Sequence, residues 1–289
     1  MITKVFYYIL LIPISCLPYR ILYLFSDFLF FIFYSIIGYR KKIVSTNLKN
    51  SFPDKTDKEL KVIMHNFYKH FCDLILEGLK GFTISEKQLK ERLIIKNPEF
   101  INYYAKKNQS IILVGGHYNN WEIYAQAFSI YSNHKCMGIY NPLSNAFMNI
   151  KMYQSRSRFG THLISMKQTK KLFQEEASSD PKAIVFGADQ NPSNPMRAHW
   201  LKFLHQDTAV VFGVEKYSKE YNCPVVFISI KKTKRGYYEV EYSVITENPT
   251  KEPYGKITED FTKRLEEDII NNPQYWLWTH RRWKHKKEE

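Results

Sequence analysis

The feature that most constrains this chain is an N-terminal stretch, residues 5–38, that is almost continuously apolar. After two prolines, the run from Ile21 to Ile37 contains Asp27 as its only charged residue. At 1.5 Å of rise per residue, this run has a marginal length for crossing a bilayer, so it either spans the membrane or lies in its interface. A cleaved signal peptide is the alternative, but the apolar run resumes after Pro18 and is longer than an h-region.

Basic residues come directly after the apolar segment at Arg40, Lys41 and Lys42, and positive charge beside a membrane segment favours the cytoplasmic side for the remainder of the chain. We therefore expect residues 1–40 to be a membrane anchor. Residues 41–289 have the length of one large domain, with little room for a second. The four cysteines are widely separated and form no CxxC pair, which argues against a disulfide framework or a zinc site.

The net charge of +14 suits an anionic membrane surface, a phosphorylated substrate or an acidic protein as partner. Nucleic acid is a fourth candidate, but the sequence has no zinc-finger spacing, no RNP1-like string and no basic heptad region. Scattered basic residues on a solvated surface are the ordinary alternative for any single cluster.

Short β-rich runs alternate with helical patterns after residue 54, which predicts an α/β fold with a mixed, largely parallel sheet flanked by helices. The expected strands are 110–114, 135–139, 182–187, 224–230 and 237–245. The expected helices are 54–81, 119–130, 144–159, 167–178, 206–221 and 255–271.

The sharpest local signal is the sequence Gly115-Gly116-His117-Tyr118-Asn119-Asn120-Trp121-Glu122, which comes after an apolar strand and opens a helix. Sites in α/β sheets form at the carboxyl ends of strands beside helix N-termini. Glu122 lies about one turn into the helix, from where its carboxylate can reach one nitrogen of His117 and leave the other as a base. The alternative is a turn histidine with a glutamate that favours the positive helix end.

Other catalytic motifs are missing from the sequence. It contains no GxSxG elbow, no GxxxxGK[ST] loop, no GxGxxG and no HExxH. A histidine–carboxylate pair without a serine or cysteine nucleophile indicates direct attack by a substrate hydroxyl on an activated acyl group. Such chemistry requires no metal or organic cofactor.

The motif resembles the HX4D/E signature of glycerolipid-type acyltransferases. The chain as a whole resembles the lipid A biosynthesis acyltransferases, the lauroyl and myristoyl transferases of Gram-negative bacteria. Beside the HX4E motif, four blocks in the family's order carry the resemblance: Tyr39-Arg40 with Val44, Asn47-Leu48 and Phe52-Pro53; Tyr140-Asn141-Pro142 with Arg156 and Arg158; Ala188-Asp189-Gln190 with Arg197 and Trp200–Leu204; and the ending Pro273–Lys284. The family often has arginine where Asn141 stands.

The resemblance implies a glycerolipid acyltransferase-like catalytic domain at the bacterial inner membrane, facing the cytoplasm. The acyl donor would be acyl-carrier protein, and the acceptor a phosphorylated glycolipid precursor of lipid A. His117 would be the general base assisted by Glu122. The expected substrate-binding residues are Arg156, Arg158, Asp189, Gln190, Arg197 and Arg281, of which the first two could hold phosphate or form structural salt bridges. Another lipid acceptor, such as an aminoacyl lipid or lysophospholipid, and a catalytically degenerate membrane-tethered binding protein are the alternatives.

Overall fold

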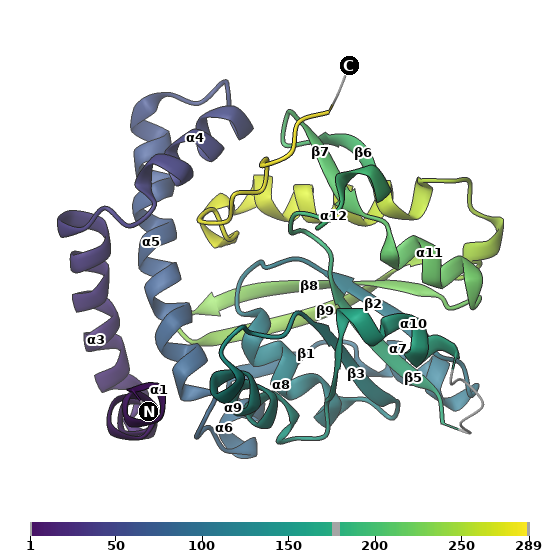
Figure 1. Cartoon of the computed structure of the whole chain (residues 1–289), viewed down its shortest axis with the longest axis horizontal. Coiled ribbons are helices and arrows are strands. Elements are labelled where there is room, and N and C mark those ends of the chain that lie inside the picture. Colours follow the sequence, from purple (N-terminus) through teal and green to yellow (C-terminus); the bar gives the residue numbers. More distant parts are fainter. Residues whose placement is uncertain (1, 175–179, 288–289) are drawn as a thin grey trace.

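A seven-stranded sheet forms the centre of the protein, seen in a computed structural model that describes residues 2–174 and 180–287 (Figure 1). The strand order is β1-β9-β8-β2-β5-β3-β4, and every neighbouring pair is parallel except β8 with β9. A separate antiparallel hairpin is made by β6 and β7. The strands are β1 (Leu93–Ile95), β2 (Ile111–Gly115), β3 (Lys135–Tyr140), β4 (His162–Ser165), β5 (Lys182–Gly187), β6 (Ala198–Phe203), β7 (Gln206–Val211), β8 (Val225–Lys234) and β9 (Tyr237–Thr246).

Helices surround this sheet: most cover its two faces, and the N-terminal ones pack outside them. They are α1 (Ile2–Phe6), α2 (Ile12–Cys16), α3 (Tyr19–Phe30), α4 (Lys41–Ser51), α5 (Asp57–Lys80), α6 (Glu86–Arg92), α7 (Pro98–Lys106), α8 (Trp121–Tyr131), α9 (Ala146–Ser157), α10 (Thr169–Gln174), α11 (Gly213–Glu220) and α12 (Lys256–Asn271). π-helical turns, η1 (Tyr7–Leu11) and η2 (Phe31–Ile36), continue α1 and α3. Short 3-10 turns are η3 (Met166–Gln168), η4 (Pro195–Arg197), η5 (Pro249–Lys251) and η6 (Pro273–Tyr275).

The central strand β2 is apolar throughout because it is buried on both faces, as parallel strands usually are. Its residues alternate between two cores. Ile112 and Val114 pack with α4, α5, α12 and the C-terminal tail, whereas Ile111 and Leu113 pack with α6, α7 and α8. This double burial fixes the strand rigidly, and the residues after Gly115 therefore leave the sheet at a defined point.

The predicted fold class is confirmed, and all five expected strands are present within a few residues of their expected bounds. The helix expected over 206–221 is wrong in its first half, because 206–211 is strand β7 and α11 begins at Gly213. Threonine and valine in that segment favour a strand, and the chain turns back at Leu204 and His205, whose φ angles are positive. The helix expected over 167–178 is present to Gln174, and its remainder lies outside the described residues.

The apolar N-terminal segment packs along one side of α5 (Figure 1). Among the described residues, Tyr19–Ile36 is the one helix long and apolar enough to cross a membrane, with 17% of its residues buried. The inward face of α3 is polar, because Tyr23 donates to Glu77 at 2.8 Å and Ser26 donates to Asp73 at 2.8 Å. The outward face is apolar and exposed.

Candidate active site

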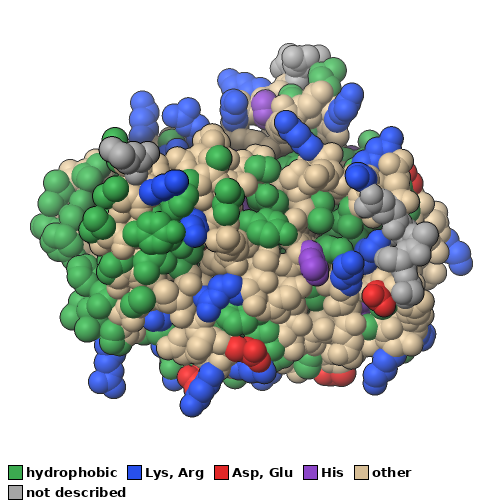
Figure 2. Space-filling view, turned by 60° about the horizontal axis from the view of Figure 1, so that its bottom comes forward, with side chains coloured by type: hydrophobic (Ala, Val, Ile, Leu, Met, Phe, Trp, Pro, Cys, Tyr) green, Lys and Arg blue, Asp and Glu red, His purple; other side chains and the backbone are tan. Residues whose placement is uncertain are grey.

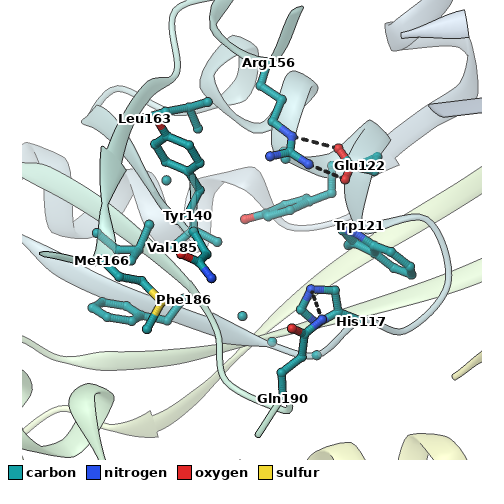
Figure 3. A pocket seen from close by; sticks show the side chains of 18 of the residues that line it. His117, Trp121, Glu122, Tyr140, Arg156, Leu163, Met166, Val185, Phe186 and Gln190 are labelled. Carbon is teal, nitrogen blue, oxygen red and sulfur yellow. Dashed lines mark hydrogen bonds and ion pairs between the residues drawn. The ribbon is translucent and has the colours of Figure 1, made fainter. Parts of the chain in front are cut away.

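A cavity of about 650 Å³ opens at the carboxyl ends of β2, β3 and β5. Figure 3 shows two pairs of polar side chains on one side of it, Arg156 with Glu122 and Gln190 with His117. The opposite side is lined by apolar side chains from β4, β5 and the turn after β4, among them Leu163, Met166, Val185 and Phe186. A largely apolar cavity with a few convergent polar groups is the ordinary form of a ligand site.

The loop between β2 and α8 is held at both of its asparagines. Asn119 adopts a positive φ of 52°, which asparagine tolerates, and its side chain donates to the Ile230 carbonyl. Asn120 caps α8, because its Oδ1 accepts from the Ile123 amide at 2.9 Å. A Cβ at Gly116 would lie 2.7 Å from a Cδ of Leu265 and 3.1 Å from Oδ2 of Asp189, so a larger residue there would require these side chains to move.

His117 is bonded through its Nδ1 to Asp189, with 2.6 Å between Nδ1 and Oδ1. The other oxygen of Asp189 accepts from the backbone amide of His117 and from the indole of Trp276, each at 2.8 Å. An ionised carboxylate only accepts hydrogen bonds, so the Nδ1 of His117 carries the proton. Its Nε2 is therefore the acceptor, and it faces the amide of Gln190 at 3.1 Å.

The pairing of two strands brings these residues together across 72 positions of sequence. Strands β2 and β5 are parallel neighbours in which Gly115 lies opposite Gly187. His117 and Asp189 each come two residues after their glycine, so they emerge side by side at the same sheet edge. Gly187 leaves room for the imidazole, because a Cβ at that position would lie 3.2 Å from Cε1 of His117 and push the ring by a few tenths of an ångström.

The surroundings tune the proton affinity of both groups. Burial lowers the pKa of His117, but the charge and hydrogen bond of Asp189 outweigh it and raise the pKa above its ordinary value. Burial raises the pKa of Asp189, yet the opposing interactions with His117 and Trp276 bring it down to about 2. Asp189 is thus ionised at neutral pH, and it makes His117 a stronger base.

The structure corrects the expected partner of His117. Glu122 forms a bidentate ion pair with Arg156 on α9, with distances of 2.9 Å to Nε and 2.5 Å to Nη2. The carboxylate on the imidazole is Asp189, which the sequence analysis expected to bind substrate. Glu122 remains close enough for its charge to raise the pKa of His117.

The other candidate residues separate into two groups. Gln190 and Arg156 line the cavity with His117 and Glu122. Arg158 instead donates to the carbonyls of Gly81 and Phe82. Arg197 and Arg281 are exposed and are not among the described residues that line the cavity.

Two residues support the site in ways that the sequence did not predict. Trp276, in the C-terminal block, is 2% exposed, and its indole donates to Asp189, so this core residue orients the carboxylate. Glu77 on α5 accepts from Asn120, the cap of α8, at 2.6 Å, and from Tyr238 at 2.7 Å. A glutamate on the apolar side of the last turn of an amphipathic helix was the available signal, because a buried charge requires partners.

A histidine bound to a buried carboxylate at a strand-to-helix turn, beside a largely apolar cavity, is an arrangement suited to proton transfer on an apolar substrate. The family of bacterial lipid A biosynthesis acyltransferases matches residues 1–285, and this chain belongs to that family and is an acyltransferase.

Three curated relatives are similar to this chain over most of their length. A lipid A biosynthesis acyltransferase of Haemophilus influenzae is 23% identical over 96% of this chain and 88% of the relative. The lipid A biosynthesis lauroyltransferase of Escherichia coli is 22% identical over 94% and 88%, respectively. The palmitoleoyltransferase of the same organism is 21% identical over 85% and 79%.

Proposed function

We propose that the protein transfers a fatty acyl chain from acyl-carrier protein to a hydroxyl of a phosphorylated lipid A precursor, at the cytoplasmic face of the bacterial inner membrane. The observation that carries this proposal is His117, whose Nδ1 is bound by a buried carboxylate while Nε2 faces a largely apolar cavity. The net charge of +14 suits both an acidic carrier protein and a phosphorylated acceptor.

In the proposed reaction, the acceptor hydroxyl displaces the Gln190 amide from Nε2 of His117 and donates its proton there. The hydroxyl oxygen attacks the thioester carbonyl, and the charge of the resulting imidazolium is balanced by Asp189. The tetrahedral oxyanion then requires donors, and the candidates are the displaced Gln190 amide and the backbone amides of Trp121 and Glu122 at the start of α8. When the intermediate collapses, the ester is released and the departing thiolate of the carrier takes the proton from His117.

In this mechanism Glu122 and Arg156 do not take part in the proton transfer. Their ion pair borders the cavity, and Glu122 raises the proton affinity of His117 through its charge. An acceptor phosphate that reaches Arg156 must compete with Glu122 for the guanidinium, because both anions match its planar fork.

The decisive experiment is transfer by purified His117→Ala. Removal of a general base is expected to lower the rate by about 10²–10⁴ while the protein stays folded. Near-normal turnover would exclude the mechanism. Mass spectrometry of total lipids from a deletion strain identifies the acceptor, since loss of an acyl chain from lipid A supports the proposal and loss from a phospholipid or aminolipid supports the alternative acceptor.

A further inference from the structure

Exposed apolar side chains gather over the N-terminal helices, at the left of Figure 2. On α3 and η2, Leu24, Phe28, Phe31 and Ile36 are each more than half exposed. Monomeric soluble proteins rarely leave a patch of this kind in water. This face is therefore suited to contact with a membrane, and its extent and orientation can be read from the residues around it.

The orientation of α3 is set by its opposite face. Arg235, from the turn between β8 and β9, binds both Asp27 of α3 and Asp73 of α5. These contacts, with those of Tyr23 and Ser26, fasten α3 lengthwise to α5. If α3 crossed the bilayer, it would take α5 with it.

Helix α5 is unsuited to the hydrocarbon interior. Lys58, Lys61 and Lys69 are exposed along it, and Lys69 lies over the Phe30 ring of α3, 5.7 Å from its centroid. A lysine at the centre of a bilayer costs at least about 2.5–3.5 kcal/mol. An interfacial position avoids this cost, because the apolar side of α3 enters the lipid while α5 stays in water.

The apolar surface continues from the N-terminal helices onto α9. The Tyr7 ring meets Phe147 edge-on with 5.4 Å between centroids, and Asn145 donates to Thr3. Next to this junction, Ile150 and Tyr153 of α9 are 53% and 40% exposed. Lys151 lies over the Tyr7 ring at the same junction, where a cation can meet anionic headgroups.

The mouth of the cavity lies in the same region. Leu143, Tyr153 and Met166 line the cavity, yet each is 40% exposed or more. Apolar side chains shared between a cavity and the outer surface mark an entrance that is apolar on both sides.

We propose that helices α1–α3, α9 and the residues around Leu143 and Met166 form one surface that lies in a single leaflet of an anionic membrane without crossing it. The cavity then opens directly toward the lipid, and acyl chains and a lipid acceptor enter it sideways from the leaflet. This inference rests on geometry and exposure, and it stands whether or not the proposed acyl transfer is correct.

The test places an environment-sensitive fluorophore on single cysteines of the full chain. Cys16 is exposed and is first changed to serine, whereas Cys72, Cys136 and Cys223 are buried. The fluorophore is placed by Ile150→Cys on α9. The matched control is Tyr254→Cys, at a position that is 73% exposed. It belongs to the loop between β9 and α12, on the side of the molecule opposite α3 in Figure 1.

Vesicles of phosphatidylcholine and phosphatidylglycerol are then added. The label at 150 is expected to shift to shorter wavelength and brighten, and the label at 254 to stay as in water. Equal fluorescence changes at the two positions would refute the proposal that α9 belongs to the membrane-binding surface. The readout requires no turnover, so its failure is separate from failure of the acyltransferase mechanism.

A second pair of labels, introduced by Ile21→Cys and Ile37→Cys, decides between lying in and crossing the membrane. Both positions are exposed and lie near the two ends of the apolar segment. A membrane-impermeant reductant added outside the vesicles is expected to quench both labels. Protection of one label and not the other would show a crossing segment and refute the proposal.

Discussion

The substitution Asp189→Asn distinguishes the observed His117–Asp189 pair from the His117–Glu122 pair that the motif predicts. Oδ2 of Asp189 accepts two hydrogen bonds, from the His117 amide and from Trp276. In the variant the single oxygen of asparagine will take that position, because both partners are donors. Its NH2 group then faces Nδ1 of His117, forces the imidazole proton onto Nε2 and removes the base from the cavity.

The magnitude has a lower and an upper bound. A hydrogen bond to a charged group contributes about 1.5–3 kcal/mol, and the bond from Nδ1 of His117 to Asp189 becomes one when the imidazolium forms. Loss of that charge alone is therefore expected to slow transfer by about 10- to 100-fold. Loss of the correct tautomer as well brings the reduction toward about 10⁴-fold, as in the serine-protease triad.

The pH profile provides a signature that a merely structural defect would not. The neutral form of His117 is the base, so activity falls as the pH decreases through its pKa. Asp189 raises that pKa, and without its charge burial lowers it. The acidic limb of any residual activity is therefore expected to move to lower pH in Asp189→Asn.

The assay is steady-state release of thiol from an acyl thioester in the presence of the lipid acceptor, with circular dichroism and thermal unfolding to confirm folding. Glu122→Gln is the matched comparison, because it also replaces a carboxylate with an amide beside the cavity. If Asp189→Asn loses less than about ten-fold, or if Glu122→Gln is the more damaging of the two, the assignment of Asp189 as the partner of His117 is wrong.

Three further results are expected. Gly187→Ala should reduce kcat by roughly ten-fold or more with little loss of stability, because its Cβ displaces the His117 ring. The control Gly78→Ala has open space around it and should leave kcat unchanged. Equal kinetics in the two variants would contradict this prediction. Glu77→Gln should lower the free energy of unfolding by about 1–3 kcal/mol in denaturant titrations. The reason is that a glutamine amide cannot accept from Asn120, Tyr238 and Tyr23 together. An unchanged denaturation midpoint would show that this network is dispensable. Arg156→Lys should raise the acceptor KM and leave the donor KM nearly unchanged, because only the acceptor carries the contacted phosphate, and a change confined to the donor would assign Arg156 to the carrier-protein interface.

The class of fold and the position of His117 are both predictable from the sequence alone. Alternation of apolar strands with amphipathic helices predicts the α/β sheet, because burial patterns are local in sequence. The strand–Gly-Gly-His–helix arrangement puts His117 at a carboxyl strand end for the same reason. The apolar N-terminus likewise indicates membrane contact from composition alone.

The carboxylate that serves His117, in contrast, is set by long-range packing. Local spacing favours Glu122, five residues away, and no local rule selects Asp189, 72 residues away. The choice depends on the parallel pairing of β2 with β5 and its register of Gly115 opposite Gly187. Glu122 is then drawn to Arg156 by the packing of α9, a contact between separate helices. Because strand order and helix packing join residues far apart in the chain, the partner of the base is a consequence of the assembled sheet.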